Sequence, residues 1–185
     1  MDDRSDVIDS FGWYGAARPL ASPNCDDRPA DCAVELLLLH NISLPPNEFG
    51  SDAVLQLFTN SLDYDAHPYY AGLVGLRLSA HFFIRRDGAM WQFVPCTRRA
   101  WHAGVSHWRG RDRCNDFSIG VELEGADHLA FDQSQYAALD RLTAALQRVY
   151  PLVAVAGHSD VAPDRKTDPG PHFDWSRCTR LPRLV

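Results

Sequence analysis

The feature that most constrains the fold is a run of apolar residues that ends at His40, Val34-Glu35-Leu36-Leu37-Leu38-Leu39. The run is too short for a helix, and Pro45-Pro46 follow it closely. Short runs of this composition are typical of strands that are buried on both faces. We therefore predict a buried strand over residues 34–39, with His40 at its carboxyl end.

Two patterns predict a short helix and a hairpin after this strand. Asp52 is a residue type that caps helices, and the apolar side chains of residues 54–58 would pack the following helix on the sheet. Between His81 and Pro95, two apolar runs are joined by Asp87-Gly88. This pair tolerates the positive φ angles of a tight turn, so we predict a β-hairpin there.

The second half of the chain predicts a strand, a helix and another strand. Residues 117–123 alternate as a strand does, and Asp132 with Gln135 has the spacing of a capping box. Residues 153–156 form the next predicted strand, which delivers Gly157-His158 into a loop. Between them, the helix should end before Pro151 and bury one face, made of Tyr136, Leu139, Leu142, Leu146 and Val149.

Composition limits both the architecture and the partners. A chain of 185 residues with 45% apolar residues has enough material for one domain with one core. The net charge of −6 argues against nucleic acid or an anionic membrane as the main partner, because both recruit clustered Lys and Arg. Residues 1–30 mix Asp, Arg, Pro and Ser with a few aromatic residues, which indicates an irregular segment packed on the domain.

The compartment is predicted from the N-terminus and the cysteines. The first residues, Met-Asp-Asp-Arg-Ser-Asp, lack the basic start and apolar stretch of a secretory signal, and no apolar run approaches a membrane span. We therefore expect a cytoplasmic protein that does not act at a membrane. An odd number of irregularly spaced cysteines cannot all pair, so we expect reduced thiols at Cys25, Cys32, Cys96, Cys114 and Cys178.

One histidine stands out among the eight by its context. His158 precedes the turn-rich stretch 159–171, which carries carboxylates and a lysine and is stiffened by prolines and a glycine. Together with a carboxylate and a second histidine from a distant strand, His158 would form a three-ligand zinc set with a fourth position open for catalysis. The chain has no Cys-x-x-Cys or His-Glu-x-x-His motif, so spacing alone does not select the ligands.

Between Trp13 and Trp175 the chain resembles a known family in six stretches. These are Leu39-His40-Asn41-Ile42-Ser43-Leu44-Pro45-Pro46, Ser79-Ala80-His81, Arg85-Arg86-Asp87-Gly88, Ala100-Trp101-His102-Ala103-Gly104-Val105-Ser106, Cys114-Asn115-Asp116-Phe117-Ser118-Ile119-Gly120-Val121-Glu122-Leu123-Glu124-Gly125 and Ala162-Pro163-Asp164-Arg165-Lys166-Thr167-Asp168-Pro169-Gly170-Pro171. The chain is similar to the type 2 N-acetylmuramyl-L-alanine amidases, and within them to the cytosolic AmpD-type enzymes of peptidoglycan recycling.

The resemblance implies a fold and a reaction. The fold class is α/β (α+β): a central mixed β-sheet flanked by helices in a single domain, with a zinc amidase domain over residues 31–185. The implied reaction is hydrolysis of the amide that joins anhydro-N-acetylmuramic acid to L-alanine in peptidoglycan fragments. The expected partner is therefore an anhydro-muropeptide substrate, the expected cofactor is one zinc ion, and we expect a monomer.

The resemblance also implies roles for individual residues. The zinc ligands of the family fall on His40, His158 and Asp168. Its catalytic carboxylate falls on Glu122, which would take a proton from water, and Lys166 falls where the family places a cation near the scissile carbonyl. Glu124 lies on the same face of the strand, because alternate strand residues share a face, so the strand pattern alone does not separate the two glutamates.

Five further residues are candidates for binding substrate. Arg77 and Arg113 could grip the carboxylates of the stem peptide, because a guanidinium matches the planar geometry of a carboxylate. The alternative for both is a plain surface charge. Asn41, Trp101 and His102 are expected to line the groove, although Trp101 could equally belong to the core. We expect His81, which follows an apolar stretch, to pack inside the fold.

Two other functions compete with this prediction. A receptor with the same fold could bind muropeptides without cutting them, and it would be expected to lose a zinc ligand. An amidase acting on intact cell wall outside the cytoplasm is the second alternative, and the absence of an export signal argues against it. Because the three expected ligands, Glu122 and Lys166 are all present, the sequence favours the enzyme.

Overall fold

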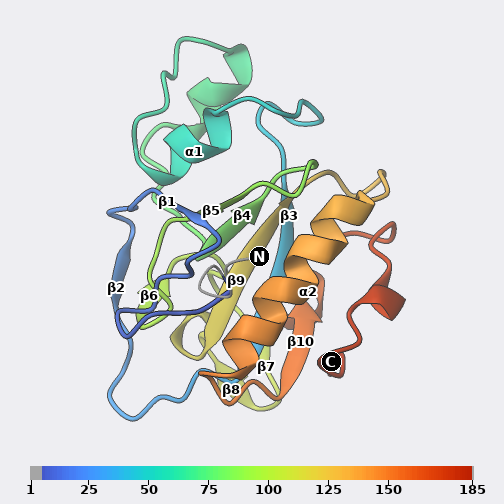
Figure 1. The fold of residues 1–185 in the computed structure, drawn as a ribbon. Coiled ribbons are helices and arrows are strands. Elements are labelled where there is room, and N and C mark those ends of the chain that lie inside the picture. The colour runs from blue at the N-terminus through green and yellow to red at the C-terminus, as the bar shows by residue number, and fades with distance from the viewer. Residues whose placement is uncertain (1–5, 185) are drawn as a thin grey trace.

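Six strands form a mixed β-sheet in the computed structural model, which describes residues 6–184 (Figure 1). In chain order they are β1 (Arg18–Pro19), β3 (Leu36–Ile42), β4 (Phe82–Ile84), β5 (Met90–Gln92), β9 (Ser118–Glu124) and β10 (Ala154–Gly157). Across the sheet the order is β1-β5-β4-β9-β3-β10, and only the β4–β5 pair is antiparallel. The predicted α/β (α+β) class, a central mixed sheet flanked by helices in one domain, is confirmed.

The remaining elements are short apart from one helix. Two further strand pairs form, β2 (Cys25–Asp27) with β6 (Arg98–Ala100) and β7 (His107–Trp108) with β8 (Arg111–Asp112). The helices are α1 (Ala53–Phe58), α2 (Gln133–Gln147) and α3 (His158–Val161), with 3-10 turns η1 (Pro68–Leu73), η2 (Cys114–Asp116) and η3 (Trp175–Arg177). Over residues 6–184, no helix combines the length and the apolar character that crossing a membrane requires.

The apolar run of residues 34–39 forms most of strand β3, between β9 and β10, but the limits of the strand differ from the prediction. The strand begins at Leu36 and continues to Ile42, so His40 lies inside the strand and not beyond its end. The reason is the neighbouring strand β9, which pairs with β3 in register as far as Ile42. Tertiary pairing therefore extends the strand beyond its apolar residues.

Helix α2 matches its predicted start and its predicted face. The capping box forms, with the backbone N–H of Asp132 donating to Oε1 of Gln135 at 3.0 Å. Four of the five predicted core residues are buried, the exception being Val149. The helix ends at Gln147, so Val149 lies beyond its last turn and is half exposed.

The predicted hairpin and the predicted short helix both form, although the cap of the helix differs. Asp87-Gly88 makes the turn between β4 and β5, with Gly88 at a positive φ of 85°. Asp52 stands at the N-cap position of α1, but its carboxylate does not cap the helix. It accepts a hydrogen bond from Arg85 of the hairpin instead, at 2.6 Å. An ion pair between elements has replaced the local cap that we expected.

The two faces of the sheet differ in what they carry. Figure 1 shows α2 lying across one face. That face is apolar, and its core includes odd-numbered residues of β3, β9 and β10, namely Leu37, Leu39, Ile119, Val121, Leu123 and Val155. The even-numbered residues point to the opposite face because side chains alternate along a strand. There, Leu36 and Leu38 are followed by His40.

The described part of the N-terminal segment is tied to the sheet by backbone pairing and by one partly buried arginine. Strand β1 adds to the sheet edge beside β5, and β2 pairs with β6. The guanidinium of Arg28 donates to the carbonyl oxygens of Cys96, Asn115, Asp116 and Ser118. The division at residue 30 stays a prediction, and what we expected of residues 1–5 lies outside the described residues.

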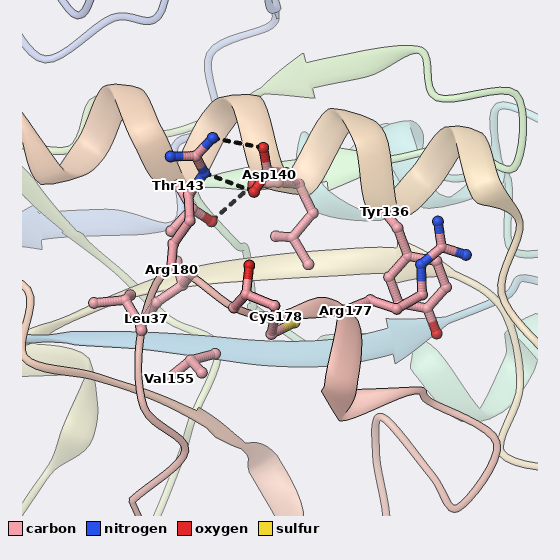
Figure 2. A pocket seen from close by; sticks show the side chains of 11 residues that line it. Leu37, Tyr136, Asp140, Thr143, Val155, Arg177, Cys178 and Arg180 are labelled. Carbon is pink, nitrogen blue, oxygen red and sulfur yellow. Dashed lines mark hydrogen bonds and ion pairs between the residues drawn. The ribbon is translucent and has the colours of Figure 1, made fainter.

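The C-terminal segment packs along α2. Figure 2 shows the side chain of Arg180 reaching Asp140 of that helix, and both of its contacts are short, at 2.6 and 2.8 Å. Leu181 is buried beside this ion pair. All five cysteines are free thiols, as the sequence predicted.

Candidate active site

The carboxyl ends of three parallel strands bring polar side chains together on the face opposite α2. His40 of β3 and Glu122 of β9 are register partners, so their side chains lie next to each other. Gly157, the last residue of β10, pairs with Leu39 and places His158 on the other side of His40. Binding sites commonly form at the carboxyl ends of neighbouring parallel strands, because several strand ends open there at once.

Three potential ligand atoms from His40, His158 and Asp168 meet at one point of this edge. The Nδ1 atoms of the two histidines lie 3.0 Å apart, and Oδ2 of Asp168 lies 3.0 Å from the first and 3.1 Å from the second. Nε2 of His158 lies 3.1 Å from the carbonyl oxygen of Ala103. A carbonyl only accepts, so Nε2 carries the proton and Nδ1 keeps its lone pair.

This arrangement fits a metal ion. A carboxylate oxygen and an imidazole lone pair repel each other unless a cation or a proton lies between them. Tetrahedral zinc bound by nitrogen and oxygen holds its ligand atoms about 3.3 Å apart, close to the spacing found here. The donor set of two imidazoles and one carboxylate is also one that zinc uses in catalytic sites.

The loop that carries Asp168 is anchored to the sheet. The backbone N–H of Ser159 donates to the carbonyl oxygen of Asp168 at 2.9 Å. The side-chain amide of Asn41 donates to the carbonyl oxygen of Pro169 at 3.1 Å and to the carboxylate of Asp127 at 2.6 Å. These bonds fix the aspartate against β3, which is what a preorganised ligand requires.

The electrostatics of the site keep His40 and Asp168 in the forms that bind metal. Burial lowers the pKa of His40 to about 4, against the raising effect of its contact with Asp168. Burial would raise the pKa of Asp168, but the contacts with His158 and His40 outweigh it and hold this pKa below its usual range. A neutral imidazole therefore faces an ionised carboxylate at neutral pH, and these are the forms that coordinate a metal.

Glu122 is a buried carboxyl group with an unused oxygen. The side chain is almost fully buried, and its Oε2 has no hydrogen-bond partner within the described part of the chain. Burial raises its pKa well above the usual range, the nearby Asp168 raises it further, and Lys166 opposes both. A buried polar atom left without a partner costs free energy, so its persistence beside the cluster points to a function.

Glu124 lies on the same strand face as Glu122, but both of its carboxylate oxygens accept hydrogen bonds. One of its oxygens accepts from the backbone N–H of Gly50 at 2.6 Å, and the other accepts from the backbone N–H of Arg86 at 3.1 Å. It therefore joins the loop before α1 to the hairpin. The structure thus separates two glutamates that the strand pattern could not.

A cavity of about 270 Å³ opens in front of the candidate metal ligands His40, His158 and Asp168. Glu122 and Lys166 line it together with the three candidate ligands. Other parts of its lining come from the segment around α1 and η1, which lies beyond one end of the sheet (Figure 1). These residues are mainly apolar: Leu44, Leu57, Tyr69, Leu73, Leu76 and Leu78.

The five predicted substrate-binding residues fall into two groups. Asn41, Trp101 and His102 line the cavity. Arg77 and Arg113 have exposed side chains that do not line it. All five roles stay predictions. His81, which we expected to pack in the fold, is fully buried.

Sequence reasoning overlooked residues that support the ligands without touching the cavity. Arg165 donates to the carbonyl oxygen of Ala103 at 2.9 Å, the same oxygen that faces His158. The side-chain oxygen of Asn115 accepts from the backbone N–H groups of His102 and Ala103, at 3.1 and 2.8 Å. Both residues lie in stretches that carried the family resemblance, but only the fold shows what they hold.

Comparison with known proteins agrees with this geometry. The sequence profile of the family described as N-acetylmuramoyl-L-alanine amidase matches residues 32–171. The chain is 56% identical over 172 residues to the 1,6-anhydro-N-acetylmuramyl-L-alanine amidase AmpD of Citrobacter freundii, and the match covers 92% of each protein.

Solved structures show the same relationship. The crystal structure of a selenomethionine derivative of AmpD matches with a TM-score of 0.88 at 53% identity, over 92% of this chain and 96% of that one. A complex of the N-acetylmuramyl-L-alanine amidase AmiD from Escherichia coli with anhydro-N-acetylmuramic acid-L-Ala-D-gamma-Glu-L-Lys matches with a TM-score of 0.58 at 29% identity, over 84% of this chain and 62% of that one.

Proposed function

The chain belongs to the N-acetylmuramoyl-L-alanine amidase family, and from this premise we propose that it hydrolyses the amide between anhydro-N-acetylmuramic acid and L-alanine in peptidoglycan fragments, with one zinc ion. The zinc ligands in this proposal are His40, His158 and Asp168. The proposed role in the cell is the recycling of cell-wall peptidoglycan.

One observation carries the proposal: three potential metal ligands and a buried carboxyl group with a free oxygen face the same cavity. A zinc amidase needs both, a metal with an open coordination position and a base beside it. Each feature alone has structural explanations, such as a buried salt bridge. The two features together, at the carboxyl ends of neighbouring parallel strands, favour hydrolysis.

Glu122 acts as general base and then as general acid. It takes a proton from the attacking water and returns that proton to the departing amine of L-alanine. A carboxyl group suits both steps when its pKa is raised toward the working pH, because it can then gain and lose the proton easily. The burial of Glu122 raises its pKa in that direction.

Lys166 stabilises negative charge on the carbonyl oxygen as the tetrahedral intermediate forms. It lines the cavity two residues before Asp168 and opposes the raised pKa of Glu122, so its charge acts within the site. Zinc supplies Lewis-acid chemistry, making water a nucleophile near neutral pH and polarising a carbonyl. A cation fixed near the developing oxyanion is worth about 10²–10³ in rate.

The cavity has a polar side and an apolar side, which suits a substrate with both kinds of surface. The mainly apolar lining from the segment around α1 and η1 offers contact to a sugar ring or a lactyl methyl group. For the peptide stem, Arg77 and Arg113 are the proposed carboxylate clamps. Asn41, Trp101 and His102 are the proposed contacts inside.

Three wider expectations also stay proposals. We propose a cytoplasmic location, because the substrate class is a soluble fragment and not intact wall. We propose a monomer with the site contained in one chain. We also propose the division into an N-terminal segment of residues 1–30 and a zinc amidase domain of residues 31–185.

The experiment that tests the proposal uses anhydro-N-acetylmuramyl tripeptide as substrate and mass spectrometry of the products. Zinc-loaded protein should release free tripeptide, and protein treated with a chelator should not until zinc is restored. Glu122→Gln should lose activity by about 10²–10⁴-fold. Glu124→Gln is the matched control, because it changes a neighbouring buried carboxylate outside the proposed mechanism and should keep its rate per folded molecule.

The alternatives give different results in the same assay. Binding of the tripeptide substrate without any cleavage would favour the receptor. Faster cleavage of polymeric peptidoglycan than of the free fragment would favour an enzyme of the intact wall. Equal activity with and without zinc would contradict the metal assignment.

A further inference from the structure

His40 and His158, the two histidines among the candidate metal ligands, have different hydrogen-bond partners at their Nε2 atoms. Nε2 of His158 faces the carbonyl oxygen of Ala103, which can only accept, so the proton of this ring is fixed. Nε2 of His40 faces Nδ1 of His102, 3.0 Å away. Either of these two nitrogens could donate, so the form of His40 depends on the form of His102.

The other side of the His102 ring decides its form. Its Nε2 lies 3.4 Å from Oγ of Ser118, a long contact. The Ser118 hydroxyl has one proton, and it donates that proton to the carbonyl oxygen of Cys114 at 2.6 Å. Oγ is therefore left as an acceptor, so Nε2 of His102 is the donor and Nδ1 of His102 accepts from His40. In this series of hydrogen bonds, every donor points away from the candidate metal ligand atoms.

The His102 ring is held in a slot that only glycine leaves open. A Cβ built on Gly120 of strand β9 would lie 2.5 Å from the ring, nearer than atoms can approach. The backbone at His102 is held by Asn115, whose side-chain oxygen accepts from the N–H groups of residues 102 and 103. The ring therefore has a fixed place between His40 and His81.

We propose that His102 is a positioning residue for the metal site: it holds His40 with its proton on Nε2 and the lone pair of Nδ1 facing the metal. This inference rests on the proposed function, because the ligand role of His40 is part of it. Partners of this kind fix the tautomer of a ligating histidine, and their loss typically lowers metal affinity by about 10–100-fold.

The test compares two substitutions at the same position. His102→Asn keeps an acceptor oxygen where Nδ1 stood, whereas His102→Ala removes it. Zinc affinity is measured by competition with a chromogenic chelator. His102→Ala should bind zinc about 10–100-fold more weakly, and His102→Asn should recover most of that loss.

A second measurement reads the tautomer directly in metal-free protein. Long-range ¹H–¹⁵N NMR spectra of the histidine rings distinguish a proton on Nδ1 from one on Nε2. His40 should be protonated on Nε2 in the wild-type protein and in His102→Asn, and should become a mixture of both forms in His102→Ala. Ser118→Ala, which removes the acceptor that faces Nε2 of His102, should shift His40 in the same direction to a smaller extent.

The outcomes separate this inference from the proposed function. Unchanged zinc affinity and an unchanged His40 tautomer in His102→Ala would overturn it, even if activity fell, since His102 would then act on the substrate alone. If wild-type protein bound no zinc, the proposed function would fail, and the His40 tautomer in metal-free protein would still decide the inference. Should His102→Ala not fold, Ser118→Ala and His102→Asn supply the comparison.

Discussion

The two faces of the central sheet come from the same strands yet serve opposite purposes. On the face covered by α2, the odd-numbered residues of β9 and of β3 as far as Leu39 are apolar and buried. On the other face, His40, Glu122 and His158 are just as buried but polar. Apolar burial stabilises a fold by roughly 25 cal/mol per Å², whereas burial of an unpaired carboxyl group costs free energy.

The difference shows that a single strand can serve both purposes. Because its side chains alternate, one set stabilises the fold and the other set reaches the candidate site. A residue on the α2 face should affect folding without affecting the reaction. A polar residue of the proposed site should affect the reaction, and its replacement can raise stability, because sites of this kind trade stability for function.

The largest effect is expected when a proposed metal ligand is removed. His158→Ala should lower the amidase rate by about 10³-fold or more, because the metal contributes several kcal/mol to catalysis. Zinc should also no longer raise the melting temperature, since ligand binding to the folded state is what stabilises it. Activity assays and thermal unfolding with and without zinc measure both. A variant that still gains stability from zinc would contradict the ligand assignment.

Glu122→Gln should separate activity from stability. The rate should fall by about 10²–10⁴-fold, because the proposed proton carrier is lost. The metal-free variant should be more stable than wild-type protein at neutral pH, since burial raises the pKa of Glu122 and disfavours its ionised form. Urea unfolding at pH 7 tests this. A large loss of stability would mean that Glu122 holds the fold together.

Leu142→Ala tests the opposite face. Leu142 of α2 is fully buried against the sheet. Its truncation should lower the free energy of unfolding by about 2–5 kcal/mol and leave kcat near the wild-type value wherever the protein is folded. Denaturant unfolding and kinetics at low temperature are the measurements. A selective loss of kcat in the folded variant would break the separation of the faces.

His81 predicts how stability depends on pH. Its ring accepts from the backbone N–H of Gly120, and burial together with the Arg28 guanidinium lowers its pKa from 6.5 to about 3. The folded pKa is below the unfolded one, so this contribution to stability is complete above pH 6.5. It is lost as the pH falls toward 3, by up to about 1.4 kcal/mol per unit.

His81→Gln should therefore show a flatter fall in stability between pH 6.5 and 4 than wild-type protein, whatever its stability at pH 7. Urea unfolding across that range gives the slope. His128→Gln replaces an exposed imidazole and is the control. Parallel slopes for wild-type protein and His81→Gln would show that other groups dominate the acid transition.

The smallest effect is expected at the start of α2. Asp132→Ala removes the N-cap side chain of α2 and its ion pair with Arg86, and should cost about 1 kcal/mol of stability. The amidase rate per folded molecule should not change. A change in rate would show that the helix start is coupled to the site on the other face.

Much of the fold could be predicted from local signals. The capping box, the Asp87-Gly88 turn and the apolar face of α2 follow from residue types at fixed spacing, because these elements depend on neighbours in the chain. The same signals failed at Asp52, where Arg85 of the hairpin takes the carboxylate that was expected to cap α1. Long-range partners override local preference in such places.

The sequence by itself determined the list of candidate groups: the histidines, the acidic residues and the lysine, with the family resemblance to select among them. Only the tertiary structure decided which of them meet. The register between β3 and β9 places His40 beside Glu122. The backbone N–H groups of Gly50 and Arg86 donate hydrogen bonds to the two carboxylate oxygens of Glu124. Strand register and hydrogen-bond partners arise from chain segments far apart in sequence, so spacing along the chain does not encode them in a form that can be read locally.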